Sequence, residues 1–233
     1  MAQGGSLANR ITDLIGAQYS TDAVYEGDLI NAAINEIADM LPEDILLKYS
    51  AVGVQQVAAD VANGYNIEDK KVLKVIRRDS SIDRECIPLT LTEYQKAADN
   101  DSIYKATSFS PVYTIDYNNN TPILRIKPDC TDTDKGFIYC FSYASGDNAT
   151  KTQSTINSDL NLPTNIIHAI ALKSSVNILK AYISNQVQDE EDVELLQMIQ
   201  VQSQALEKDF LTEMQRFVGP GGLSGKQQEV KAE

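Results

Sequence analysis

Tryptophan is absent from this chain, and histidine is nearly so. The 233 residues include no Trp and one His, and aromatic residues make up only 7%. A single histidine excludes a metal site built from several imidazoles within one chain. That residue, His168, follows two isoleucines in an apolar helical pattern, so we interpret it as a packed or surface helix residue rather than a catalyst. The few aromatics leave little material for a deep aromatic ligand pocket.

Cysteine is also scarce, and its spacing fits no metal motif. Cys86, Cys130 and Cys140 are an odd number, and none of them form a pair at zinc-ligand spacing. The first ten residues lack the apolar core of a secretory signal, and no apolar run approaches the ~20 residues that span a bilayer. We therefore expect free thiols in a reducing cytoplasm and no membrane segment.

Positive charge is the third deficit. Acidic residues number 33 against 20 basic ones, for a formal net charge of -13 at pH 7. Proteins that grip nucleic acid neutralise phosphates with clustered Lys and Arg. The closest runs here, at Lys70 and Arg77, are each diluted by a neighbouring acid. We expect no stable nucleic-acid binding; the acidic surface suits plain solubility, and it also suits letting DNA pass without sticking.

Apolar residues recur at helical spacing near both ends of the chain. The pattern predicts helices over residues 6–18 and 27–41, with Ser6 as N-cap, Pro42 as a stop and a short helical turn at 43–48. A third helix is expected from Pro163 to Gln186, and a fourth after the acidic run 189–192, since carboxylates favour a helix N-terminus. The last two form an antiparallel hairpin. The fourth helix carries an apolar stripe: Leu196, Ile199, Leu206, Phe210, Met214 and Phe217.

The middle of the chain alternates with a period of two. We predict strands at 52–57, 72–77, 112–117, 122–127 and 137–143, a short helix at 92–99 and a loop at 145–159. The asparagine run at 118–120 predicts a hairpin turn, because Asn tolerates left-handed conformations. The expected fold is α+β: an antiparallel helical bundle formed by the N- and C-terminal helices, with a small antiparallel β domain inserted. The expected boundaries are 1–50 and 146–218 for the bundle, 51–145 for the β domain and 219–233 for a flexible docking tail.

No motif that carries chemistry is complete. Glycine patterns for nucleotide binding are absent. One loop places Asp129, Asp132 and Asp134 before Gly136, but it lacks the bidentate Glu and the flanking helices of an EF-hand. We interpret it as a solvated turn, and we predict no catalytic residue, no cofactor, no metal and no enzyme activity.

Several segments, taken in order, carry a resemblance to a known family. Residues 25–36 read YEGDLINAAINE, and the strand at 71–76 follows an element at 65–69 in which the family's proline is missing. The middle contains PLT at 88–90, EY at 93–94, PVYTI at 111–115 after Ser110 in place of a glycine, and ILRIKP at 123–128. Leu162 and Pro163 then open the apolar helix. Over about residues 11–217 this order is similar to that of the head-to-tail adaptor (connector or neck-ring) proteins of tailed phages.

This resemblance implies a structural virion protein with no chemistry of its own. A ring of about twelve copies would join the portal to the tail and continue the DNA channel. Its place is the virion neck, after synthesis in the host cytoplasm. The implied partners are further copies of the chain, the portal protein and tail, nozzle or other neck proteins. Double-stranded DNA passes through without specific binding, and no membrane is involved.

The chain's end is the expected docking segment. Its glycines allow it to extend, and its apolar residues can add a strand or fill a groove on the portal or on a neighbouring subunit. A tail without order before any partner is present is the alternative. The candidate docking residues are Phe217, Val218, Gly219, Gly221, Gly222, Leu223 and Val230.

Three other functions stay open at this point. Another neck, collar, stopper or tail-nozzle ring would share the fold, because fold does not fix position in a stack. A cytoplasmic scaffold module would bind protein partners through its helical hairpin and form a small, fixed oligomer. A metal-dependent hydrolase would bind divalent ions tightly at Asp129, Asp132 and Asp134.

Overall fold

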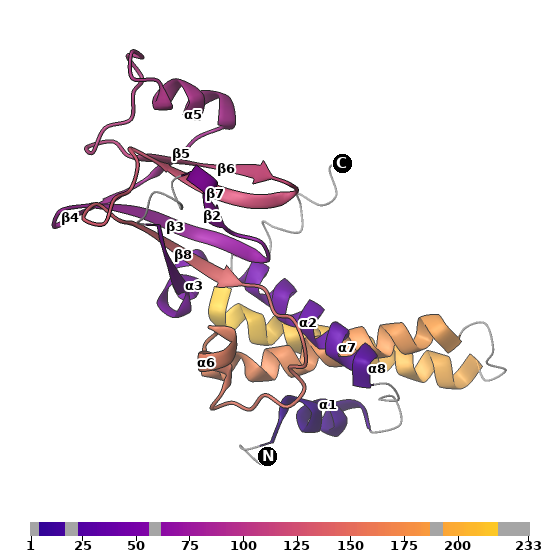
Figure 1. The fold of residues 1–233 in the computed structure, drawn as a ribbon. Coiled ribbons are helices and arrows are strands. Elements are labelled where there is room, and N and C mark those ends of the chain that lie inside the picture. The colour runs from indigo at the N-terminus through magenta and orange to yellow at the C-terminus, as the bar shows by residue number, and fades with distance from the viewer. Residues whose placement is uncertain (1–4, 17–22, 56–61, 187–192, 219–233) are drawn as a thin grey trace. The chain divides into compact units, whose positions relative to one another are not determined.

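The fold is α+β, with N-terminal helices packed against C-terminal helices and two four-stranded sheets inserted between them in the sequence (Figure 1). The computed structural model describes residues 5–16, 23–55, 62–186 and 193–218. The chain divides into two compact units. Residues 1–46 and 143–233 form the helical unit, and residues 47–142 form the β unit.

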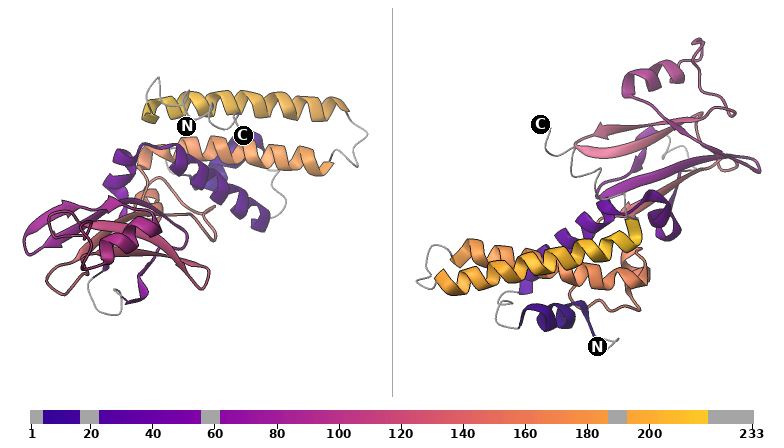
Figure 2. Two further views of the ribbon diagram at one scale, coloured as in Figure 1. Left: turned by 90° about the horizontal axis from the view of Figure 1, so that it is seen from above. Right: turned by 180° about the vertical axis from the view of Figure 1, so that it is seen from behind.

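In the helical unit, α7 is the central element. It packs against α1, α2 and α8, and α8 runs beside it in the opposite direction (Figure 2). The unit contains α1 (Leu7–Ile15), α2 (Ala23–Met40), α6 (Ile156–Leu160), the 3-10 turn η2 (Thr164–Ile166), α7 (Ile167–Gln186) and α8 (Val193–Val218). A further short helix, α3 (Glu43–Tyr49), begins in the helical unit and ends in the β unit.

The apolar composition of α7 follows from its central position. By length and composition, the stretch Thr164–Ser184 could cross a membrane, and 67% of its most apolar window is buried inside the protein. The expectation that no apolar run has this length was therefore wrong. A helix covered on several sides needs apolar residues all round it. Burial against three other helices accounts for that composition.

A buried cation ties three helices of this unit together. Lys173 of α7 is 8% exposed, and its Nζ lies 2.7 Å from Glu36 Oε1 of α2. The same Nζ lies 5.5 Å from the ring centroid of Phe210 of α8. Charge pairing and a cation–π contact thus compensate for the desolvation of the ammonium group.

A polar ladder on α2 holds the segment that follows the β unit. Asn31, Asn35 and Asp39 are spaced by four residues, which places them on one face of the helix. Their side chains bind residues 143–148. The bonds are Asn31 Nδ2 to Gly146 O at 2.8 Å, Asn148 Nδ2 to Asn31 Oδ1 at 2.6 Å, Ala144 N to Asn35 Oδ1 at 2.7 Å and Tyr143 Oη to Asp39 Oδ1 at 3.1 Å.

The predicted loop at 145–159 was wrong at its end. Residues 156–160 form α6, whose Ile156 and Leu160 are buried. The segment before it also binds α1, since Leu7 N donates to Lys151 O at 2.7 Å and Ala8 N donates to Ala149 O at 2.9 Å. These bonds satisfy first-turn amides of α1 that have no partner within the helix.

The β unit contains two sheets. One has the order β1-β8-β3-β4 and the other β2-β7-β6-β5; the described pairs are antiparallel except β5 with β6, which is parallel. The strands are β1 (Ala51–Gln55), β2 (Tyr65–Asn66), β3 (Lys70–Asp79), β4 (Ile82–Glu85), β5 (Ile87–Pro88), β6 (Val112–Asn118), β7 (Thr121–Lys127) and β8 (Gly136–Ser142). The helix α5 (Leu91–Ala98) connects β5 to the segment before β6.

Side chains from both sheets form one apolar core. Gly136 begins β8 at a point where the backbone comes close to that core, because a Cβ there would meet the side chains of Ile126 and Cys130. The core cluster consists of Ile67, Val75, Cys86, Leu124, Ile126, Cys130, Ile138 and Cys140.

Two local predictions are confirmed by backbone geometry. The turn between β6 and β7 has Asn119 and Asn120 at φ of 49° and 66°, the left-handed pair that a tight hairpin needs. Thr90 caps α5, and Glu93 completes a reciprocal capping box. The short strands β2, β4 and β5 were not predicted, since two to four residues show no periodicity.

Candidate interaction site

The predicted docking residues lie at the end of α8 and beyond it. Phe217 and Val218 are the last residues of α8, and both are half-buried. The other predicted docking residues lie outside the described part of the chain: Gly219, Gly221, Gly222, Leu223 and Val230.

The aspartate loop between β7 and β8 is paired with cations of this same chain. Arg77 is 4% exposed, and its Nε donates to Pro128 O at 3.1 Å. Its Nη2 lies 3.7 Å from Asp134 Oδ2, and Lys127 Nζ lies 2.7 Å from Asp129 Oδ1. Among the residues that the structure describes, no group of three His, Cys, Asp or Glu side chains is placed to hold a metal ion. This loop therefore reads as an ion-paired turn.

The three cysteines are buried free thiols of the β unit. Burial raises the pKa of Cys86 to about 12 and that of Cys130 to about 11, and it also raises the pKa of Cys140. A nucleophilic cysteine needs a lowered pKa and access to solvent. The surroundings of these thiols favour a structural role.

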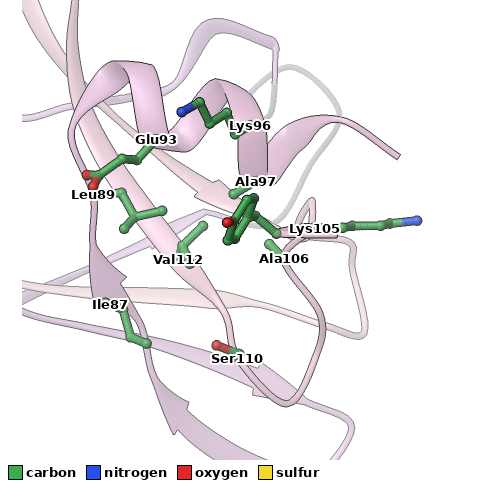
Figure 3. A pocket seen from close by; sticks show the side chains of 10 residues that line it. Ile87, Leu89, Glu93, Lys96, Ala97, Lys105, Ala106, Ser110 and Val112 are labelled. Atoms are coloured by element: carbon green, nitrogen blue, oxygen red, sulfur yellow. The ribbon is translucent and has the colours of Figure 1, made fainter. Parts of the chain in front are cut away.

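An apolar pocket opens on the β unit beside α5 (Figure 3). It has a volume of about 400 Å³. The β-unit pocket, as we name it, is lined by the apolar residues Ile87, Leu89, Ala97, Tyr104, Ala106 and Val112. Glu93, Lys96, Lys105 and Ser110 complete the lining. Large apolar side chains gather near it in the segment between α5 and β6: Ile103 is 91% exposed, Tyr104 70% and Phe109 81%.

The charges at this pocket are mainly basic in effect. Glu93 is occupied by the α5 cap, where its Oε2 accepts from Thr90 Oγ1 at 2.8 Å. Lys96 and Lys105 form no ion pair with any residue in the described ranges. In Figure 3 the Lys105 side chain points away from the pocket. The pocket thus combines apolar walls with two lysines that are available to an acidic partner.

A second apolar surface lies on α8. Met198 and Val201 are 69% and 66% exposed, although the opposite side of the same helix buries Ile199 and Phe210. With the exposed Ala205 they form a row at helical spacing, which we name the α8 stripe. A shallow groove of about 680 Å³ runs along it and includes Leu195 and Glu194.

Negative charge is concentrated in one unit. The ranges of the helical unit contain 20 acidic and 8 basic residues, and the range of the β unit contains 13 and 12. The helical unit thus carries a formal charge of -12 and the β unit -1. The acidity of the chain is therefore a property of its helical part.

Sequence reasoning missed the pocket and the α8 stripe. A signal was present for the first, because Ile103, Tyr104 and Phe109 interrupt a polar segment with turn-forming neighbours. For the stripe the signal was weak, since Met198 and Val201 lie within a helix that already has an apolar face.

Comparison with protein-family models and with curated proteins finds no match for this chain.

Proposed function

We propose that this chain is a structural ring subunit in the neck of a tailed phage, which joins the portal to the tail and continues the DNA channel. The observation that carries the proposal is the division of charge between the two units. The order of the elements supports it, because helices from both ends of the chain enclose an inserted β unit in the sequence, as in the adaptor proteins that the chain resembles.

The helical unit suits a surface that DNA must pass without binding. Duplex DNA carries one negative charge per ~1.7 Å of its axis. A wall with a net charge of -12 per subunit repels it at distances within a Debye length, about 8 Å at physiological salt. We assign the channel to the helical unit for this reason.

The β unit suits contacts with protein. Its net charge is close to zero, and it exposes Ile103, Tyr104 and Phe109. Large exposed apolar side chains that lie together mark interaction surfaces. In this proposal, the β unit contacts neighbouring subunits or other neck proteins.

Electron microscopy of the purified chain with the portal protein of the same genome tests the function. The expected result is a ring that caps the portal with matching symmetry, while each protein alone serves as control. A chain that ignores the portal contradicts the adaptor position and favours a ring lower in the neck. A small oligomer that never forms rings favours the scaffold module instead.

Docking by the C-terminal tail has its own test. Removing residues 219–233 deletes a segment after the end of α8, so the α7–α8 hairpin is expected to keep its helical content by circular dichroism. Portal binding should be lost. The matched control exchanges only Lys226 and Lys231 for Gln, which keeps the tail and its apolar Leu223 and Val230. Full portal binding by the truncated chain would refute the docking role of the tail.

A further inference from the structure

Two apolar surfaces, one on each unit, have no partner among the described residues. The α8 stripe exposes Met198 and Val201 by two thirds or more, and the β-unit pocket opens beside the exposed Tyr104. Solvent-exposed apolar side chains that cluster in this way favour burial against another molecule.

We infer that the α8 stripe of one copy of this chain docks into the β-unit pocket of the next copy. The inference rests on the proposed ring function and names the contact that builds the ring. The occupant of the pocket is thus a second copy of the chain.

The shapes and chemistry of the two surfaces fit each other. Met198 and Val201 project from a helix, whereas Leu89, Ala97 and Val112 line a hollow of about 400 Å³. A methionine fills irregular apolar space well, because its side chain is unbranched and polarizable. Knob and hollow belong to different surfaces, so each can be satisfied only by the other or by a foreign protein.

Charge favours the same pairing. The pocket has Lys96 and Lys105 at its edge without an ion pair among the described residues, and the stripe belongs to a unit with a net charge of -12. Glu194 lines the groove of the stripe at its N-terminal end. Docking would bring lysines to an acidic surface, which steers association and fixes orientation.

The use of two different surfaces also decides the symmetry. A contact between unlike patches repeats head to tail and closes into a ring when the rotation permits it. A contact of the α8 stripe with itself would give a twofold dimer that stops growing. The inferred contact is therefore of the kind that a neck ring needs.

Engineered disulfide crosslinking tests the contact directly. Val201→Cys places a thiol on the stripe, and Ser110→Cys places one at the exposed edge of the pocket. The three native cysteines are buried and leave a low background. After mild oxidation in the presence of the portal, the double variant should give a ladder of covalent multimers on a non-reducing gel. Each single variant should stay uncrosslinked.

Surface variants measure the strength of the contact. Val201→Asp is paired with Gln200→Asp, which changes an exposed α8 residue outside the groove. Tyr104→Ser is paired with Tyr117→Ser, because both tyrosines are 70% exposed. We expect Val201→Asp and Tyr104→Ser to raise the concentration at half-assembly by roughly tenfold or more, as measured by mass photometry. The two controls should assemble as the unchanged chain does.

The outcomes separate this contact from the ring function. Rings that persist in Val201→Asp and Tyr104→Ser overturn the contact and leave the ring function standing. Dimers from Val201→Cys alone also overturn it, since α8 then pairs with itself. A ladder from the double variant without portal capping supports the contact and refutes the adaptor function. A chain that stays monomeric, with or without the portal, overturns both.

Discussion

The helical unit and the β unit solve the same physical problems in different ways. The helical unit carries nearly all of the net charge and buries its cation, Lys173, between helices. The β unit balances its charges, buries Arg77 against main-chain carbonyls and exposes aromatic side chains. An average over the whole chain hides this difference. A net charge of -13 suggests a uniformly acidic surface, whereas the division into units gives an acidic part and a neutral, adhesive part.

The largest effect is expected for one pair of phenylalanines. Phe210 of the helical unit is 1% exposed, and Phe109 of the β unit is 81% exposed. Phe210→Ala should lower the free energy of unfolding by about 3–5 kcal/mol, because it leaves a cavity in the packed core. Phe109→Ala should change it by less than ~0.5 kcal/mol. Urea denaturation followed by circular dichroism measures both, and equal effects would contradict the assigned burial.

Alkaline pH should weaken the β unit in particular. Burial raises the pKa of Cys86 to about 12, whereas a thiol in the unfolded chain ionises near 8.5. Between these values the unfolded chain has lost a proton that the folded chain retains, so stability falls as pH rises. From pH 8 to pH 10 this thiol should lower the free energy of unfolding by roughly 2 kcal/mol.

Cys86→Ala isolates that thiol from the tyrosines and lysines that ionise in the same range. The variant starts less stable because it removes a buried sulfur, but its decline from pH 8 to pH 10 should be shallower than that of the unchanged chain. Urea denaturation at both pH values measures the two declines. The same slope in both proteins would mean that the Cys86 thiol is not protected in the folded chain.

A pair of neighbouring arginines tests how the β unit treats buried charge. Arg77→Leu should lower the free energy of unfolding by about 1–3 kcal/mol, because the carbonyl oxygens of Pro128 and Asp129 lose their donors. Arg78→Leu removes an ion pair with Asp83 in which both side chains are more than 40% exposed. Such pairs contribute roughly 0–1 kcal/mol. If Arg78→Leu has the larger effect in urea denaturation, the structural role of Arg77 is wrong.

The smallest effect concerns the polar ladder of the helical unit. Asn31→Ala removes a donor to Gly146 O and an acceptor for Asn148, so we expect a loss of about 1–2 kcal/mol. Asn9→Ala is the matched control, since Asn9 is an exposed asparagine in α1 of the same unit. Both exchanges improve helix propensity equally. Thermal unfolding by circular dichroism should show a lower midpoint for Asn31→Ala alone.

Much of the fold could be predicted because it follows from local patterns. The apolar stripe of α8 and the arrest of α2 near Pro42 are visible in a few neighbouring residues. The hairpin at Asn119 and Asn120 is predictable for the same reason, since few residues accept a left-handed turn. By contrast, α6 and the short strands depend on what they pack or pair with, and no local periodicity indicates them.

The candidate site was less predictable than the fold. Leu89, Ala97 and Val112 come from separate elements, and only the folded β unit brings them to one pocket. The predicted candidates at the chain's end were found from glycines and scattered apolar residues, which indicate extension but name no partner surface. Pockets form from residues distant in the sequence, so their geometry leaves little trace in a local pattern.

The sequence by itself determined the helices, the main strands, the α+β order and the total charge, because each depends on neighbouring residues or on composition alone. The tertiary structure decided which apolar residues of α8 face solvent, with Val201 exposed and Phe210 buried on one helix. It also decided that Arg77 neutralises the aspartate loop and that the acidic residues gather in one unit. These features arise from contacts between distant segments, where burial and pairing are set by the whole fold.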